Sequence, residues 1–246
     1  MLLPIIIVGL SLIIIERIVP DQKLPHIKGW WIRVVIVNLL QLGVIVIGKL
    51  SWDNWLAGAR VFELELHPML GGFLGYFVVT FVFYWWHRWR HTINLFWLLF
   101  HQLHHSPNRI ETITSFYKHP LEIVCNALLI GAVNHILLGL NLESAAWCLL
   151  YASLGEYFYH MNIRTPHWIG YIFQRPEMHR IHHQRSKHFS NFSDFPIWDM
   201  LFGTFKNPPT YQGKCGFKPE REGRLGDILA FKNVNNPFPP KRKKES

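Results

Sequence analysis

The sequence has few charged residues and few cysteines for its length. Charged side chains make up 17% of the 246 residues, whereas 50% of the residues are hydrophobic. The three cysteines, Cys125, Cys148 and Cys215, are odd in number and have no paired spacing, which excludes a disulfide framework and a zinc ribbon. The first two fall inside long apolar runs. This composition is typical of a membrane protein.

Five apolar segments are each near the length that crosses a hydrocarbon core as a helix. They are residues 2–19, 31–50, 69–86, 121–138 and 142–159. The first segment lacks a preceding basic region and a following cleavage site, so we interpret it as a transmembrane helix or anchor. Its Glu16-Arg17 pair is expected at an interface, because charges are costly within lipid. The sequence predicts an all-α fold, a multi-pass transmembrane bundle of four to five membrane helices.

Basic residues are unevenly distributed between the connections. The connection 17–33 carries four Lys or Arg residues, whereas 51–68 carries one Arg against three acidic residues. By the positive-inside rule the first connection is cytosolic, and following the chain onward puts every dense histidine segment in a cytosolic helical cap. The net charge of +9 and the tail PKRKKES predict contact with anionic lipid headgroups rather than with nucleic acid.

Nine histidines recur in short patterns just beyond the apolar segments. FYWWHRWRH places two of them four residues apart, and HQLHH and HRIHH each place three at i, i+3 and i+4, on one face of a helix. Another histidine ends the fifth apolar segment. The nine are His87, His91, His101, His104, His105, His160, His179, His182 and His183.

So many histidines in one place are best explained by metal binding. Packed together, the rings would repel one another if protonated and would lack partners if neutral. Imidazole suits zinc, copper, iron and nickel, so the ligand type leaves the metal open. Nine rings exceed one tetrahedral zinc and suggest two metals with four or five ligands each. HExxH, the zinc protease motif, is absent, and two irons for oxygen chemistry become the leading interpretation.

The ordered motifs HRWRH, HQLHH and HRIHH, followed by WDMLFGTF at residues 198–205, resemble the fatty acid hydroxylase and sterol desaturase superfamily of membrane di-iron oxygenases. The resemblance covers roughly residues 75–207. It implies two iron ions held by the eight box histidines, with His160 as an additional ligand, and O2 as co-substrate. It also implies three regions: membrane helices and loops at 1–68, a di-iron catalytic domain at 69–207 and a cytosolic basic tail at 208–246.

Four other residues are candidates for a further ligand or for contact with the ligand histidines. Glu156 stands where some members of the superfamily have a histidine, and we expect it to accept a hydrogen bond from an imidazole. His119 lies in FYKHPLE, which resembles an HP-x-E element, and it either binds metal, lines the substrate entrance or caps the next helix. Asp199 and Asn191 are expected to orient ligand histidines.

The remaining histidines receive ordinary interpretations. His26 and His67 lie in connections remote from the boxes, and His135 lies near the far end of its helix. His167 and His188 flank the third box, where contact with substrate headgroups is an alternative, and we interpret them as solvated loop residues.

The resemblance implies O2-dependent hydroxylation or desaturation of a lipid C–H bond in a fatty acyl chain, sterol or membrane lipid that enters from the bilayer. The sequence shows no flavin or dinucleotide fingerprint, so electrons are expected from a separate partner of the ferredoxin or cytochrome b5 type. The alternatives are a histidine-lined metal transporter and an electron carrier. Both call for ionisable residues within several helices, whereas the boxes follow the helices. The expected location is a bacterial inner membrane or, because KKES fits a retrieval signal, the endoplasmic reticulum.

Overall fold

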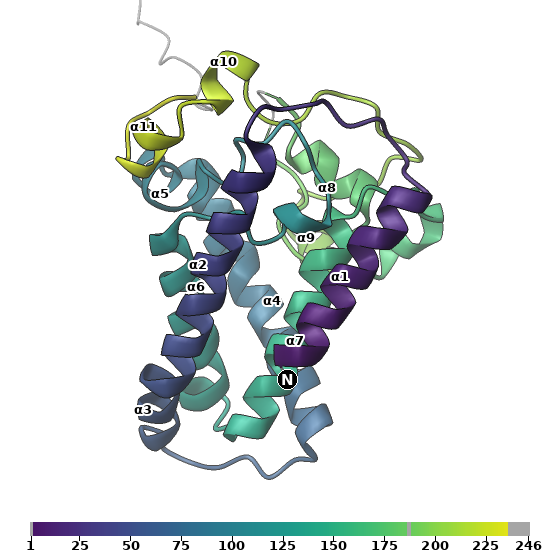
Figure 1. The fold of residues 1–246 in the computed structure, drawn as a ribbon. Coiled ribbons are helices and arrows are strands. Elements are labelled where there is room, and N and C mark those ends of the chain that lie inside the picture. Colours follow the sequence, from purple (N-terminus) through teal and green to yellow (C-terminus); the bar gives the residue numbers. More distant parts are fainter. Residues whose placement is uncertain (1, 186–187, 236–246) are drawn as a thin grey trace, which may run out of the picture.

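The computed structural model describes residues 2–185 and 188–235 of the chain as an all-helical fold (Figure 1). The helices in chain order are α1 (Leu2–Ile18), α2 (Trp30–Leu50), α3 (Trp52–Gly58), α4 (Pro68–Thr92), α5 (Asn94–Phe96), η1 (Trp97–His101), η2 (Thr112–Thr114), α6 (Pro120–Gly131), η3 (Ala132–Leu137), α7 (Leu142–His160), η4 (His167–Tyr171), α8 (Pro176–His182), α9 (Pro196–Leu201), α10 (Pro219–Glu222) and α11 (Leu225–Leu229). Within the described ranges no β-strand forms, and the prediction of an all-α fold is confirmed. The tail PKRKKES lies outside the described residues.

Three helical stretches are long and apolar enough to cross a membrane. They are Trp30–Gly58, Pro68–Thr92 and Pro120–Leu137, and they correspond to the second, third and fourth predicted segments. Helices α1 and α7 also form where the sequence predicts them, over 17 and 19 residues, but fall outside these three. The chain is an integral membrane protein by these helices, and the total of four to five membrane helices stays a prediction.

Helices α4 and α7 make the most extensive helix–helix contact in the described chain. A small residue lets the two backbones approach closely: a Cβ atom at Gly72 would lie 2.3 Å from the Cβ atom of Trp147. Asn141 caps the start of α7, where its side chain accepts the backbone N–H of Ser144. Both helices therefore deliver their C-terminal residues to the same end of the molecule (Figure 1).

The side chain of Glu16, at the end of α1, is held in the protein interior. The side chain of Glu16 is completely buried, where its carboxylate accepts the backbone N–H groups of Thr112 and Asn162, at 2.9 and 3.0 Å. Arg17 remains exposed and pairs with Glu111, and the position of the Glu16-Arg17 pair at a membrane interface stays a prediction. The segment around η2 folds over the end of α1, and its backbone donors replace the water that the carboxylate would otherwise need.

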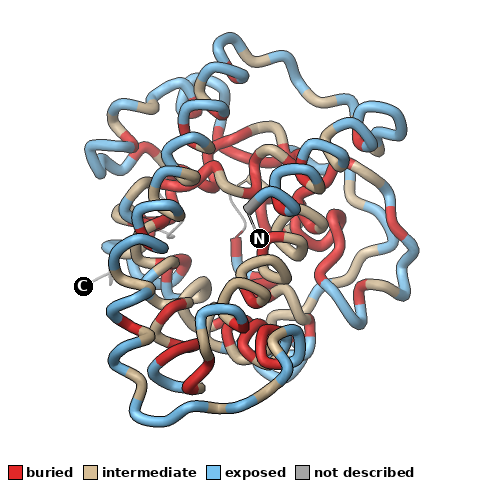
Figure 2. Tube along the Cα trace, turned by 60° about the horizontal axis from the view of Figure 1, so that its bottom comes forward, coloured by how far each residue is buried: buried red, intermediate tan, exposed pale blue. Residues whose placement is uncertain are grey.

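The outer faces of α1 and α2 are apolar and exposed. Figure 2 shows both helices mostly in pale blue, and their exposed side chains include Leu10, Ile14, Leu39 and Ile47. Exposed apolar surface of this extent is expected where a protein contacts lipid.

The region 208–246, expected as a tail, contributes to a buried core where it is described. Phe217, Ile228 and Val234 pack in one cluster with Trp97, which precedes the histidine pattern HQLHH, and with Leu103, the leucine of that pattern. The segment 217–234 is therefore folded against the histidine region, because its three apolar side chains share a buried core with residues of that region.

Helix α9 packs along the side of α4 rather than beyond its end. The ring of Trp198 lies 5.2 Å from Phe77 and 4.9 Å from Phe81, and Phe202 lies 4.8 Å from Trp85. The Trp198 indole also donates to Thr80 Oγ1 at 3.0 Å. The C-terminal half thus reaches alongside a candidate membrane helix, and the simple division into a bundle and a separate cap does not describe it fully.

Candidate metal centre

The nine predicted histidines lie together at the end of the bundle where α4 and α7 finish. The last turns of α4 carry His87 and His91, and the last residue of α7 is His160. HQLHH begins in the π-helical turn η1, and HRIHH lies in α8 and the residue after it. A π-helical turn is wider than an α-helical one and is frequent at functional sites.

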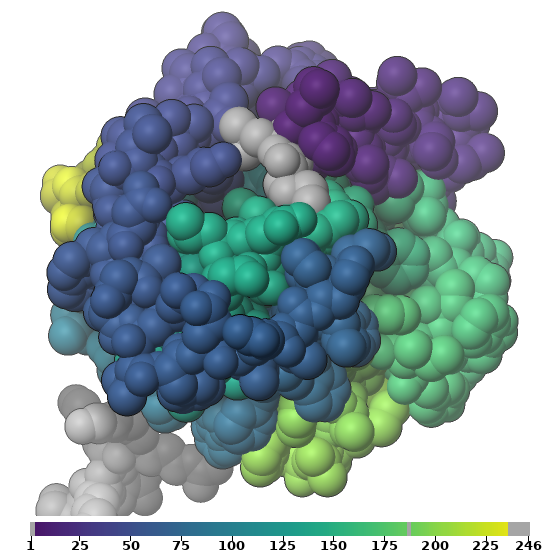
Figure 3. All heavy atoms as spheres, turned by 90° about the horizontal axis from the view of Figure 1, so that it is seen from below, coloured from purple at the N-terminus to yellow at the C-terminus, as the bar shows by residue number. Residues whose placement is uncertain are grey.

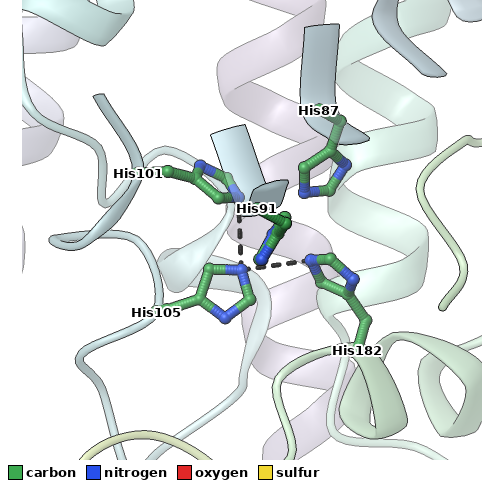
Figure 4. A group of neighbouring side chains, drawn as sticks. All are labelled: His87, His91, His101, His105 and His182. Atoms are coloured by element: carbon green, nitrogen blue, oxygen red, sulfur yellow. Dashed lines mark hydrogen bonds between the residues drawn. The ribbon is translucent and has the colours of Figure 1, made fainter. Parts of the chain in front are cut away.

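The nine rings form two groups. The first contains His87, His91, His101, His105 and His182, and the second contains His104, His160, His179 and His183. Within each group one ring nitrogen per residue lies within 4.8 Å of the others. Figure 4 shows the first group, in which five rings from three segments surround one small space.

Each HxxHH pattern is divided between the two groups. In HQLHH, His101 and His105 belong to the first group, whereas His104 belongs to the second. In HRIHH the division is reversed, since His182 alone joins the first group. On a helix, positions i and i+4 differ by about 40° and position i+3 lies about 100° from i+4, so the middle histidine points to a different side. We expected three rings on one face, and this division is a finding of the tertiary structure.

The ring nitrogens of each group converge on one another. His105 Nε2 lies 3.2 Å from His101 Nε2 and 3.1 Å from His182 Nε2, as the dashed lines in Figure 4 show. In the second group His179 Nε2 lies 3.0 Å from the Nε2 atoms of His160 and His183. A buried neutral imidazole has one N–H, so such clusters cannot satisfy every nitrogen by hydrogen bonds alone. Converging lone pairs are the arrangement that a metal ion requires.

Four of the outward-facing nitrogens have acceptors that fix the ring tautomers. The Nδ1 atoms of His87, His160 and His182 each lie 2.8 Å from a backbone carbonyl oxygen, those of Phe192, Glu156 and Ser190 respectively. A carbonyl only accepts, so Nδ1 must carry the proton and Nε2 keeps its lone pair for the interior of the group. His179 Nδ1 bonds the Gln174 side-chain oxygen at 2.7 Å in the same way.

A carboxylate that we did not single out orients His101. Glu122 Oε1 lies 3.1 Å from His101 Nδ1 and also pairs with Arg90, and all three side chains are buried. Its signal in the sequence was the last letter of FYKHPLE, an acidic residue in the first turn of an apolar helix. A carboxylate partner raises the basicity of a ligating imidazole, so Glu122 would both orient the His101 ring and strengthen it as a metal ligand.

Burial keeps the rings neutral. Removal from water lowers the pKa of His182 to about 3. The pKa of His104 lies well below its ordinary value, first because of burial and then because His183 and His160 disfavour a further positive charge. At neutral pH these imidazoles therefore offer lone pairs, which is the form that binds a metal ion. The donor set, the tautomers and the protonation state all fit a resident metal.

Two of the additional candidates lie near the centre without contributing a ligand atom to either group. His119 caps α6, because its Nδ1 accepts the backbone N–H of Leu121 at 3.1 Å. Glu156 holds His160 through its backbone carbonyl, while its carboxylate pairs with Lys118 at 2.6 Å. The capping interpretation thus describes His119, and the expected acceptor role of Glu156 is carried by its backbone.

The other two candidates brace the loop after α8. Asp199 accepts the backbone N–H groups of Phe192 and Ser193, at 2.8 and 3.1 Å, and so supports the carbonyl that receives His87 Nδ1. Asn191 bonds the backbone of Met178 and Lys206. Neither side chain has a hydrogen bond to an imidazole within the described part of the chain.

His188 was wrongly interpreted as a solvated loop residue. Its side chain is completely buried, and its ring lies 4.7 Å from that of His105. Burial lowers its pKa to about 4. No sequence pattern marks it, because it lies outside the i, i+3, i+4 spacing. The other four histidines, His26, His67, His135 and His167, belong to neither group.

A buried cavity of about 70 Å³ adjoins both groups. His87 and His101 of the first group and His104 and His179 of the second contribute to its wall. Polar and charged side chains, among them Lys118, line the wall together with apolar residues of α4, α6 and α7. A small molecule in this cavity would contact the histidine centre out of bulk water.

Comparison with known proteins finds one matching protein family and several related proteins. The family model described as fatty acid hydroxylase matches residues 72–204, more than half of the chain and all nine histidines. The chain is 33% identical to an ornithine lipid hydroxylase of Rhizobium tropici over 55% of its length and 42% of that relative. It is 27% identical to the alkylglycerol monooxygenase of Homo sapiens over 63% of its length and 34% of that relative.

A third relative extends the range of lipids. The chain is 25% identical to a sphingolipid C4-hydroxylase of Schizosaccharomyces pombe over 57% of its length and 50% of that relative. The chain thus spans between about a third and a half of the length of these curated relatives. No solved structure matches it significantly.

Proposed function

The chain belongs to the fatty acid hydroxylase family, and from this premise we propose that it is an O2-dependent oxygenase that hydroxylates or desaturates a C–H bond of a lipid at two iron ions. The observation that carries the proposal is the pair of histidine groups beside one buried cavity. The relatives named above are lipid hydroxylases and monooxygenases, which supports a lipid as substrate.

Each histidine group would bind one of the two metal ions. His87, His91, His101, His105 and His182 would hold one iron, and His104, His160, His179 and His183 would hold the other. When bound, iron supplies the oxidising power for O2 chemistry at an unactivated C–H bond. Five of the nine rings have an acceptor for an Nδ1 proton: a backbone carbonyl for His87, His160 and His182, the Gln174 side chain for His179 and the Glu122 carboxylate for His101. These contacts limit the reorganisation of those five rings when metal binds.

The protein part of the reaction is to position the substrate carbon and to exclude water. The cavity brings a bound molecule against rings of both groups. Phe83, Phe192 and Val79 provide apolar parts of its wall, which disfavour bulk water beside the reacting carbon.

A second hollow supports entry of a lipid from the bilayer. A groove of about 310 Å³ lies between α1 and α2 and is lined mainly by Ile, Leu and Val residues of those helices. Figure 3 shows the molecule from the end opposite the histidines, with α1 in purple and α2 in blue-violet. On the inner side the groove reaches Phe116 and Tyr157. Lys118, two residues after Phe116, and Glu156, next to Tyr157, line the buried cavity.

The reaction also requires electrons, which we assign to a separate donor of the ferredoxin or cytochrome b5 type. We place the histidine end on the cytosolic side of a bacterial inner membrane or of the endoplasmic reticulum, following the distribution of Lys and Arg in the connections.

Metal analysis of the purified full chain, combined with oxygen uptake, tests the proposal. We expect about two irons per chain and O2 consumption that depends on added lipid and reductant, with a product heavier by one oxygen atom or lighter by two hydrogens. A haem spectrum, or metal flux without O2 uptake, would contradict the proposal and favour the electron carrier or the transporter. Comparison of lipids from cells with and without the protein would identify the substrate.

A further inference from the structure

Residues 214–217, which we call the clip, hydrogen-bond to the chain at the end of both HxxHH patterns. The backbone N–H of Gly216 donates to the carbonyl oxygen of His183, the last residue of HRIHH, at 3.1 Å. The backbone N–H of Phe217 donates to the carbonyl oxygen of Ser106, the residue after HQLHH, at 3.1 Å. Two consecutive residues of the C-terminal part thus connect the ends of two patterns that lie far apart in the sequence.

The clip also pairs with the residues that follow HRIHH. Gln184 and Cys215 form an antiparallel bridge, and the backbone N–H of Arg185 donates to the carbonyl oxygen of Lys214 at 2.9 Å. The side chain of Cys215 is buried. These contacts give the clip a fixed register against the end of HRIHH.

The guanidinium group of Arg185 bonds the clip and the chain after HQLHH at the same time. It donates to the carbonyl oxygens of Gly216 and Phe217, at 3.2 and 2.8 Å. It also donates to the side-chain oxygen of Asn108, which lies three residues after the last histidine of HQLHH. Hydrogen bonds from a charged donor are stronger than those between neutral groups. One side chain therefore stabilises the position of the clip against both patterns.

The clip passes so close to the chain after HQLHH that only glycine fits at position 216. Gly216 has a φ of +68°, in the left-handed region, and an added Cβ atom would lie 2.1 Å from the carbonyl oxygen of Pro107. A residue with a side chain would be strained at this φ, and it would also clash with backbone, which cannot turn aside as a flexible side chain can. Gly216 is therefore required for the close approach.

The clip holds two histidines that form a contact between the metal groups. The ring of His105 in the first group stacks on the ring of His183 in the second. Unlike the five rings whose Nδ1 atoms have acceptors, these two buried rings have no hydrogen-bond partner at Nδ1 in the described part of the chain. Their positions therefore depend on the backbone, and the clip bonds the backbone at His183 and at Ser106, next to His105.

We propose that the clip sets the separation of the two metal ions by holding the His105–His183 pair, with Gly216 and Arg185 as its positioning residues. This rests on the proposed two-metal function and extends the centre beyond residue 204, where the match to the family model ends. Neither the clip nor Arg185 is among the described residues that line the buried cavity. The clip therefore acts on the geometry of the metal centre and not on contact with the substrate.

Copper(II) in place of iron makes the separation measurable. Among the divalent ions of the first transition series it binds nitrogen ligands most tightly, and it carries a single unpaired electron. The metal-free full chain is loaded with a copper(II) salt, and its copper content and electron paramagnetic resonance spectrum are recorded. Two neighbouring copper ions give a signal at half of the normal field, and the relative intensity of this signal falls with the sixth power of their separation. We expect about two copper ions per chain and a half-field signal.

Two variants disturb the clip in different ways. Gly216→Ala forces the clip away from Pro107, whereas Arg185→Gln removes the charged donor without adding bulk. Both should keep about two copper ions per chain, because all nine histidines remain. Because overpacking shifts the backbone and an increase of about one eighth in the separation halves a sixth-power signal, we expect the half-field intensity to fall about twofold or more.

Each variant has a matched control outside the metal centre. Gly29 has a φ of +71° and no heavy atom within 4 Å of an added Cβ, so Gly29→Ala introduces comparable backbone strain without a clash. Arg60→Gln removes an exposed arginine that pairs with Glu63. Both controls should match the unmodified chain in copper content and in half-field intensity. If Gly216→Ala loses its helical circular dichroism, Arg185→Gln alone decides the question.

The copper measurements separate failure of this inference from failure of the proposed function. An unchanged half-field signal in Arg185→Gln or in folded Gly216→Ala, with two copper ions bound, would overturn the inference and leave the two-metal function unaffected. Loss of a copper ion from Arg185→Gln would also overturn it, because the clip would then be needed for binding and not for separation. So would two copper ions without a half-field signal in the unmodified chain. Fewer than two copper ions in the unmodified chain would contradict the two-metal function itself.

Discussion

The imidazole rings of His105 and His183 lie face to face, with centroids 4.1 Å apart and planes inclined by 16°. His105 belongs to the first histidine group and His183 to the second. The stacked pair is therefore a shared wall between the two candidate metal sites, built from one residue of each HxxHH pattern.

Removal of one ligand should affect mainly its own group. In His104→Ala the second group keeps three histidines and the first keeps all five. We expect iron per chain to fall by about half and turnover to be lost, because substrate oxidation needs both metals. Metal analysis and a lipid-dependent oxygen uptake assay measure the two effects.

His26→Ala is the matched control for this variant, since His26 is exposed and belongs to neither group. It should keep both the metal and the activity. Full metal content and activity in His104→Ala would show that the assignment of the second group is incorrect.

Glu122, the carboxylate that contacts His101, should affect the metal affinity of the first group without contacting the substrate. Glu122→Gln keeps the size of the side chain but removes the charge that faces Arg90 and His101. Changes to such supporting groups typically cost 10–100-fold in metal affinity or activity, and we expect a loss of that order. A competition titration with a chelator measures the affinity. Glu65→Gln, at an exposed position, should behave as the unmodified chain, and an equal affinity for both variants would argue against the orienting role.

Acidification should destabilise the metal-free protein. In the folded chain the pKa of His182 is about 3, whereas a histidine in the unfolded chain titrates near 6.5. Between these values the unfolded state binds more protons, so the free energy of unfolding decreases as the pH falls, by at most about 1.4 kcal/mol per pH unit for each such ring.

Chemical unfolding of chelator-treated protein at pH 7.5, 6.5 and 5.5 measures this dependence. Because histidines of the unfolded chain are already half protonated at pH 6.5, the stability should be lower at pH 6.5 than at pH 7.5, and it should fall by a larger step from pH 6.5 to pH 5.5. A stability that does not change over the whole range would mean that the rings are solvated and not buried. Bound metal should also be released on acidification, because protons compete for the same lone pairs.

The close contact between α4 and α7 should be sensitive to a single methyl group. Gly72→Ala would place a Cβ atom 2.3 Å from the Cβ atom of Trp147, and the two helices must separate to accept it. We expect a destabilisation of about 1–3 kcal/mol, as for other overpacked interiors. Gly43→Ala is the control in α2, since no heavy atom lies within 4 Å of its added Cβ. Equal unfolding midpoints for the two variants in detergent would contradict the packing described for Gly72.

The sequence alone was sufficient for the parts of this protein that depend on local periodicity. Long apolar runs predicted the helices, because lipid leaves a chain segment few other ways to satisfy its backbone. The repeated histidine spacing singled out eight of the nine rings in the two groups, because spacing on a helix controls which side chains are neighbours. The ninth, His160, was marked by its place at the end of an apolar segment. The ordered boxes also led to the family to which the chain belongs.

Other features depend on contacts between distant segments, and only the tertiary structure decided them. Glu122 meets His101, and Asp194 meets Tyr76 across 118 residues, so neither relationship has a sequence spacing that could reveal it. His188 is buried because the loop after α8 folds under the centre, although its local sequence is polar. The division of each HxxHH pattern between two groups has the same origin: helical periodicity fixes the directions in which three rings point, but the packing of α4, η1, α7 and α8 determines which other rings they meet.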